Sequence, residues 1–320
     1  MTRANTFIKA AEVWIPSEDG SILEFGSGAF GPARAFAALS RSMCFGRGEG
    51  LPGRTWDEGC PVLLSSFDPV HFRRTAAAKA VGLTCTVSLP YFASGKLKAV
   101  LVIFCGHEPE ESSALELWQS GPTGTEMSLL DGAYGEHGTI FAGVSRSTTF
   151  ARGSGLPGRA WSSGVSQFVE ELGSASAPFL RKGAAGDAGL VRGLAIPAES
   201  TNGRAHVVTL LAGAALPLAH RVEIWSAGPG MDHLRRSYAF SELHGGVSKA
   251  EASLPLSRNE PAHQGSIARA WLNGTPEISD YPASEPGAAA AAASRIGAQA
   301  IVAIPVMRAN EVAEVLALYL

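Results

Sequence analysis

Hydrophobic and polar side chains alternate from Phe7 to Pro16, and a second short run from Ser21 to Phe25 follows the dipeptide Asp19-Gly20. A period of two residues is typical of a β-strand with unlike faces, and Asp-Gly favours the tight turn between antiparallel strands. The pattern therefore predicts a β-hairpin. Because side chains alternate across a strand, Glu12 and Trp14 share one of its faces.

The pattern then changes to short helices and a second hairpin. Apolar residues at helical spacing predict an amphipathic helix over Ala33 to Met43. Pro52 suits the first turn of a short helix that Gly59 ends. The next segments predict a strand over Val62 to Ser65, a helix over Phe72 to Val81, and antiparallel strands over Leu83 to Pro90 and Lys96 to Phe104.

The same order recurs along the chain. The stretch Gly48-Glu49-Gly50-Leu51-Pro52-Gly53-Arg54-Thr55-Trp56 reappears as Gly153-Ser154-Gly155-Leu156-Pro157-Gly158-Arg159-Ala160-Trp161, and in reduced form as Gly265-Ser266-Ile267-Ala268-Arg269-Ala270-Trp271. The period is just over one hundred residues, which is the size of a domain rather than of a solenoid repeat. We therefore predict an α+β protein of three units, over residues 1–110, 111–217 and 218–320. The connections between units are short, so we expect neighbouring units to pack in one fixed relation.

Composition narrows the possible partners. The chain has 320 residues and a net charge of −3 that is spread along its length. This charge argues against nucleic acid or acidic lipid as a partner held by bulk electrostatics. Its apolar runs are too short to span a bilayer, and residues 1–6 do not resemble a signal peptide. We expect a cytoplasmic protein that binds neither nucleic acid nor membrane.

All four cysteines lie in the first unit. A disulfide framework would be denser and would extend over all three units, so we predict reduced and mostly buried thiols at Cys44, Cys60, Cys85 and Cys105. The nearby histidines have no metal-ligand spacing to these cysteines, and no metal site is predicted. No Ser/His/Asp order or paired carboxylates recur, so no catalytic residue is predicted, and the sequence does not indicate a cofactor.

The order of elements around Gly50-Leu51-Pro52-Gly53-Arg54 and Trp56 resembles that of bacterial GAF domains. The similarity covers essentially the whole chain in three copies, of which the third is degenerate. The resemblance implies a twisted antiparallel sheet flanked by helices in each unit, and a role in binding small molecules or in dimerisation. Family members usually carry an output domain. Since none is visible here, we expect a sensory protein that reports to a separate partner protein or acts as a homo-oligomer.

The glycines also allow another interpretation. Gly48-x-Gly50-x-x-Gly53 and Gly153-x-Gly155-x-x-Gly158 satisfy the dinucleotide-binding pattern. That fingerprint requires a parallel βαβ unit, whereas the surrounding pattern predicts antiparallel hairpins. A tight turn followed by a helix start explains every copy of the motif.

One Glu, one Arg and one Trp recur in each unit. If the Glu and the Arg meet under the Trp, the charge pair would fix the hairpin against the short helix, with a net stabilisation that is often near zero. We interpret the recurring set as structural: Glu12, Arg54, Trp56, Glu116, Arg159, Trp161, Glu223, Arg269 and Trp271.

A second set of basic residues recurs in two units and not in the third. We hypothesise that charges absent from the third unit serve ligand binding, because in a GAF-like layout they would flank the same side of the sheet and favour an anion. The candidates are Arg41, Arg47, Arg73, Arg74, Arg146, Arg152, Arg181 and Lys182. Surface charges, or pairing with acidic residues of a neighbouring unit, remain the alternative.

These observations predict a non-catalytic sensory protein that binds a small polar or anionic molecule in the first or second unit. Two alternatives stay open. The chain is a structural or interaction protein without a ligand, or its thiols make it a redox enzyme or a chromophore-binding GAF protein.

Overall fold

The computed structural model describes residues 5–69, 71–228, 230–246, 252–257 and 264–320. Each predicted unit contributes one antiparallel sheet flanked by helices, so the predicted α+β class is confirmed. The exact domain boundaries remain a prediction. No described helix is long and apolar enough to cross a membrane.

The first sheet has the strand order β3-β2-β1-β6-β5-β4. Its elements are β1 (Ile8–Pro16), β2 (Ile22–Ala29), α1 (Arg34–Arg41), β3 (Cys44–Gly46), α2 (Gly50–Glu58), β4 (Val62–Leu64), α3 (Thr75–Ala80), β5 (Cys85–Ala93) and β6 (Lys96–Cys105). The predicted elements of this unit are all present. The predicted helix over Phe72 to Val81 begins only at Thr75, because Phe72 packs against Phe67 in the core, with ring centroids 4.5 Å apart.

The second sheet repeats this order with β9-β8-β7-β12-β11-β10. Its elements are β7 (Ser113–Ser120), β8 (Glu126–Tyr134), η1 (Glu136–Gly138), α4 (Thr139–Ser147), β9 (Thr149–Ala151), α5 (Gly155–Ser163), β10 (Gln167–Val169), α6 (Lys182–Asp187), β11 (Arg192–Ala198) and β12 (His206–Ala212).

The third sheet has the order β15-β14-β13-β19-β18-β17, and β16 pairs with β14. Its elements are β13 (Arg221–Ala227), β14 (His233–Ser241), β15 (Gly245–Gly246), β16 (Ser253–Pro255), α7 (Ser266–Asn273), β17 (Glu277–Ser279), η3 (Pro282–Ser284), α8 (Ala288–Ile296), β18 (Ile301–Arg308) and β19 (Glu311–Tyr319). The alanine-rich segment of this unit forms α8.

The recurring glycines serve the turn and the helix start. Gly59 ends α2 with a φ of +60°, which glycine adopts without steric cost. A Cβ at Gly53 would lie 2.0 Å from the carbonyl oxygen of Gly46, and one at Gly158 would lie 2.3 Å from that of Ala151. Strand pairs within the described residues are antiparallel, for example β1 with β6 and β5 with β6. The glycines therefore permit close backbone packing, and the parallel unit of a dinucleotide site is not found there.

Each sheet buries both of its faces. On β1, Ala11 and Val13 face a core that takes residues from all three units. Ala10 and Trp14 face the opposite way, into a core formed with the helices of the first unit. The second and third units have their own helix-side cores. The chain thus has one shared central core and three peripheral cores.

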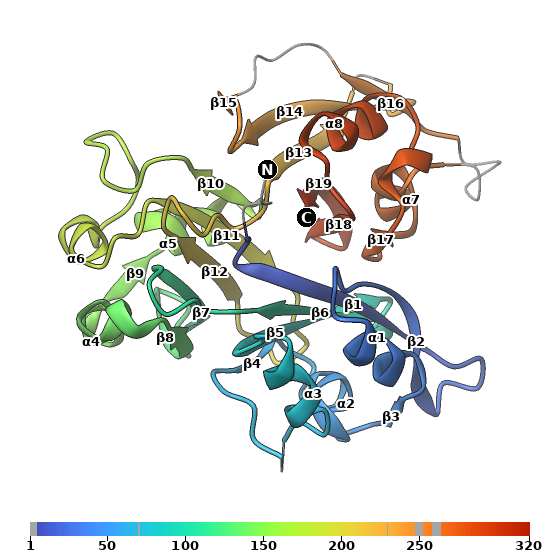
Figure 1. Cartoon of the computed structure of the whole chain (residues 1–320), viewed down its shortest axis with the longest axis horizontal. Helices are drawn as coiled ribbons and strands as arrows, with labels where there is room; N and C mark the ends of the chain where they lie inside the picture. The colour runs from blue at the N-terminus through green and yellow to red at the C-terminus, as the bar shows by residue number, and fades with distance from the viewer. Residues whose placement is uncertain (1–4, 70, 229, 247–251, 258–263) are drawn as a thin grey trace.

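The three units form a closed ring around the shared core (Figure 1). The edge strand β4 packs against β7 and β8 of the second unit, and β17 packs against β1 and β2 of the first. At the third junction Phe168 of β10 lies 5.8 Å from Tyr238 and 5.4 Å from Phe240 of β14, measured between ring centroids. β4, β10 and β17 hold the same place in their sheets, so each junction uses the same pair of surfaces in a head-to-tail arrangement that closes.

Because all three units build the shared core, we expect thermal unfolding in one cooperative transition. Near-UV circular dichroism and calorimetry on the full chain measure this. Limited proteolysis should cut within residues 106–113 without releasing a folded fragment. Stable fragments of about a hundred residues would contradict a shared core.

His206 supplies a pH-dependent part of the stability. Burial lowers the pKa of His206 to about 4, below the 6.5 of an exposed histidine. As the pH falls below 6.5, the unfolded chain binds a proton that the folded chain does not, so this contribution is lost between pH 6.5 and about 4. Relative to His206→Gln, the wild-type free energy of unfolding should fall by up to roughly 3 kcal/mol over that range. Denaturant titrations of both proteins at each pH test this. A pH-independent difference would contradict it.

Candidate functional site

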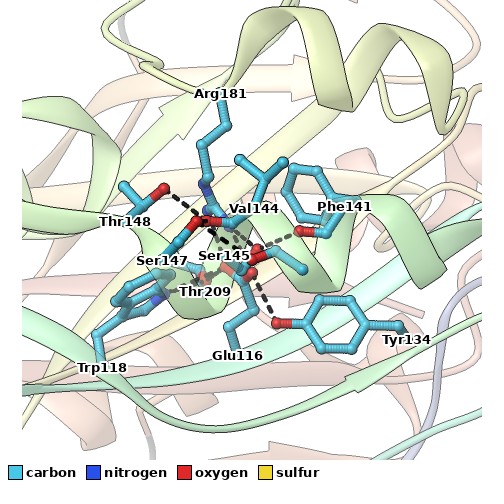
Figure 2. A network of polar contacts seen from close by, with 11 residues as sticks. Glu116, Trp118, Tyr134, Phe141, Val144, Ser145, Ser147, Thr148, Arg181 and Thr209 are labelled. Atoms are coloured by element: carbon cyan, nitrogen blue, oxygen red, sulfur yellow. Dashed lines mark hydrogen bonds and ion pairs between the residues drawn. The ribbon is translucent and has the colours of Figure 1, made fainter.

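A buried ion pair lies under the helices of the second unit (Figure 2). Arg181 is placed just before α6 and Glu116 on β7, and their guanidinium and carboxylate make two contacts, of 2.6 and 2.9 Å. Trp118 Nε1, Thr209 Oγ1 and Tyr134 OH donate to the same carboxylate at 3.2, 2.9 and 3.1 Å. Arg181 also donates to Ser145 Oγ on α4.

Aromatic rings enclose the Arg181 guanidinium. Its central carbon lies 4.5 Å from the ring centroid of Phe141 and 5.0 Å from that of Trp118. Burial alone would raise the pKa of Glu116, but the charge and hydrogen bonds of Arg181 outweigh burial and lower it. The carboxylate is therefore ionised and fully paired inside the core.

The first unit repeats the arrangement. Arg74 Nη2 contacts Glu12 Oε2 at 3.0 Å, and Trp14 Nε1 donates to the same oxygen at 3.0 Å. Arg74 also donates to Ser40 on α1, and its guanidinium carbon lies 4.6 Å from the ring centroid of Phe36.

The third unit keeps the carboxylate and replaces its partner. Glu223 Oε1 accepts from Arg221 Nε at 2.7 Å and from Arg236 Nη1 at 2.9 Å, and both arginines lie on strands. Trp225 Nε1 and Tyr319 OH donate to Oε2 at 3.0 and 2.7 Å. The third unit therefore also needs a guanidinium beside its buried carboxylate, and it supplies that group from Arg221 and Arg236. The hypothesis that its fold does not need this charge is wrong.

The predicted partner of the recurring Glu also needs correction. Arg54 does not meet Glu12; it pairs with Glu58 one helical turn away at 2.5 Å, at the surface. Arg269 likewise pairs with Glu277 at 3.1 Å. In the first unit the reason is geometric: Arg54 pairs along the surface of α2, and Arg74, just before α3, supplies the buried guanidinium.

The eight candidate ligand residues do not converge on one pocket. Arg74 and Arg181 are the core arginines described above. Arg47 pairs with Asp57 at 2.9 Å and Arg73 with Glu49 at 2.6 Å. The remaining positions are also separate: Lys182 donates to Ser174 O and Ala175 O, Arg152 lies over Trp161, Arg146 is exposed, and Arg41 lies over Phe30.

Arg41 borders a cavity of about 1340 Å³ between the first and third units. Arg34, Ala37 and Arg41 line it from one face of α1, since residues three, four and seven apart share a helix face. The opposite wall includes Asp280 and Tyr281, next to η3.

Two further charges line the same cavity. Lys9 and Glu108 pair with each other at 2.8 Å. By contrast, among the residues that the structure describes no carboxylate lies within ion-pair distance of Arg34 or Arg41. The cavity wall thus includes two arginines that have no carboxylate partner among the described residues.

Sequence reasoning named Arg41 and missed the other cavity residues. Arg34 lies seven positions before Arg41 on the predicted helix, and that spacing is a usable signal. The contribution of Asp280 and Tyr281 depends on how the third unit docks on the first, which no local pattern encodes. Within the described residues, no group of three or more His, Cys, Asp or Glu side chains is placed to hold a metal ion.

No family model and no curated protein matches the chain. Among solved structures it is similar to the GAF domain of A. aeolicus Nlh2 in an inactive state, with 20% identity and a TM-score of 0.26 over 32% of this chain and 60% of that one. It is also similar to a hypothetical protein from S. aureus, with 12% identity and a TM-score of 0.26 over 31% of this chain and 82% of that one. The GAF domain of an Acinetobacter phosphoenolpyruvate-protein phosphotransferase is similar as well, with 14% identity and a TM-score of 0.23 over 31% of this chain and 55% of that one.

Removing the core arginine should destabilise the protein strongly, because it leaves an unpaired buried carboxylate. We expect Arg74→Ala to lower the free energy of unfolding by about 3–5 kcal/mol. The matched control Arg54→Ala breaks an exposed pair and should cost about 0–1 kcal/mol. Urea unfolding of both variants measures the difference. Equal effects would contradict the structural role of Arg74.

Proposed function

We propose that this chain is a non-catalytic sensory protein that binds a small polar or anionic molecule in the cavity between its first and third units and reports to a separate partner. The observation that carries the proposal is the pair of guanidinium groups of Arg34 and Arg41 on the cavity wall, with no carboxylate partner among the described residues.

Guanidinium groups suit carboxylate or phosphate oxygens, because they donate several hydrogen bonds in a planar fork. Arg34 and Arg41 are two helical turns apart, about 10 Å along the axis. A molecule with two separated acceptor groups fits this spacing, or an anion bound by one arginine with a polar group near the other.

In the first two units the space between the sheet and its helices is already filled, and this favours the cavity as the binding site. In both, a core arginine and its aromatic cage occupy the space between sheet and helices. A ligand there would have to displace a paired, buried guanidinium, at a large free-energy cost. The cavity requires no such displacement.

A cavity with walls from two units also suits a sensor. A ligand that contacts both α1 and the segment around Tyr281 would stabilise one relative placement of the first and third units. Such a differential contact is what a ligand needs in order to shift a conformational equilibrium. A partner protein that recognises the outer surface of this junction would detect the shift.

The test is a binding screen by calorimetry against dicarboxylates, phosphorylated metabolites and nucleotides. For a ligand found this way, Arg34→Ala/Arg41→Ala should weaken binding by about tenfold or more, with the melting temperature nearly unchanged. The control Arg47→Ala/Arg73→Ala removes two arginines that are already paired at the surface, and it should bind like the wild type.

Two results would contradict the proposal. One is equal binding by both double variants. The other is a full screen without binding together with a stable oligomer in native mass spectrometry, which would favour the structural alternative.

A further inference from the structure

Two cysteines face each other across the closing hairpin of the first unit. Cys85 at the start of β5 and Cys105 at the end of β6 are direct partners in the antiparallel register. Both are fully buried and contribute to the shared central core. Because directly opposed residues project to the same face of a sheet, the two thiols lie side by side.

A histidine completes the cluster. His107 Nε2 lies 3.6 Å from Cys85 Sγ, and His107 Nδ1 lies 2.7 Å from Ser113 Oγ. His107 and Ser113 belong to the connection between the first and second units and to the start of β7. The sulfur, imidazole and hydroxyl therefore form a continuous polar chain at this junction.

The two thiols differ in acidity. Burial alone would raise the pKa of Cys85, but hydrogen bonds from Cys105 and His107 outweigh burial and lower it. Burial and the neighbouring Cys85 raise the pKa of Cys105 well above its ordinary value. Cys85 is thus the more acidic of the two thiols, and the one that attacks an oxidant as a thiolate.

The scaffold does not require sulfur at this register. In the second sheet the equivalent pair is Arg192 and Ala212, and in the third Ala300 and Leu320 take these places. The sheet therefore closes without cysteine at either position, and packing alone does not explain the thiol pair.

The geometry is also suitable for a disulfide. Opposed residues of an antiparallel pair have Cα atoms about 4.5 to 5.5 Å apart, within the roughly 4.4 to 6.8 Å found for disulfides. We propose that Cys85 and Cys105 form an oxidation site for hydrogen peroxide and close to a cross-strand disulfide.

In the first step the Cys85 thiolate attacks one peroxide oxygen. The S–O bond forms as the O–O bond breaks, and protonated His107 gives its Nε2 proton to the departing hydroxide, which leaves as water. Cys85 becomes a sulfenic acid, and the peroxide gains the two electrons that the sulfur loses.

In the second step Cys105 attacks the Cys85 sulfur. Its thiol proton passes to the departing hydroxide, so a second water forms as the S–O bond breaks and the S–S bond closes. One peroxide and two thiols thus give one disulfide and two waters.

Burial selects for a small oxidant. Cys85 and Cys105 are inaccessible from the surface, whereas Cys44 is exposed. Leu83 and Glu108, close to the pair in sequence, line the cavity between the first and third units. Hydrogen peroxide is small enough to reach the sulfurs from there after a minor opening, and a bulky maleimide is not.

The experiment uses the full chain carrying Cys44→Ser and Cys60→Ser, which keeps the pair intact. Hydrogen peroxide should remove both free thiols in the same molecules and lower the intact mass by two hydrogen atoms, and dithiothreitol should reverse the change. A bulky maleimide should not label the untreated native protein, whereas wild-type Cys44 should be labelled.

Single variants separate the roles, with alanine chosen because it occupies the equivalent register. Cys105→Ala should stop at a Cys85 sulfenic acid, which intact-mass measurement detects as the addition of one oxygen atom. Cys85→Ala should show loss of peroxide consumption. His107→Gln should slow disulfide formation by about tenfold or more.

The proposal is overturned if the pair stays reduced at a peroxide concentration that oxidises Cys44 in the wild type. It is also overturned if Cys85→Ala consumes peroxide as fast as the parent. The first result comes from the protein with the pair intact and so does not depend on how the variants fold.

Discussion

A buried carboxylate on the first strand of each sheet constrains the rest of its unit. Glu12, Glu116 and Glu223 are fully buried, and an ionised carboxylate without a partner in a core is very costly. Each one is paired with a guanidinium and accepts a hydrogen bond from a Trp Nε1–H, and in the second and third units a hydroxyl also donates to it. In the first two units the guanidinium comes from the segment before a helix, so the ion pair also anchors that helix to the sheet. This places the helices on one face and leaves the other face to the shared core.

That division has consequences for function. Once the space between sheet and helices is occupied by an arginine and its aromatic cage, a binding site has to lie elsewhere. The ring supplies alternatives at its junctions, where surfaces of two units meet without a common hydrogen-bonded sheet. The cavity with Arg34 and Arg41 lies at one junction, and the His107–Ser113 chain lies at another. Both proposed activities therefore depend on how units pack on one another.

The sequence predicted most of the fold because its signals are local. Alternation predicted β1, Gly59 predicted the end of α2, and the recurrence of the Trp motif predicted three units. The buried pair was only half predicted. Alternation along β1 correctly places Glu12 and Trp14 on one face, but recurrence in all three units favours Arg54 as the partner, whereas the structure pairs Glu12 with Arg74. The third unit satisfies the same electrostatic need with Arg221 and Arg236, so the required group is preserved while its position changes. Period-2 spacing of Arg221 and Glu223 on one strand was the available signal.

A comparison of the three units separates the residues that the fold requires from those that a single unit carries. The fold requires a residue type that all three units supply, even from different positions, as they do the guanidinium. The fold does not require a residue type that occurs in one unit while the others carry alanine, leucine or arginine at the same place. Cys85 and Cys105 are of this second kind. Three copies of one scaffold in a single chain thus act as internal controls for each other, and the departures of the first unit from the common pattern mark where function is to be sought.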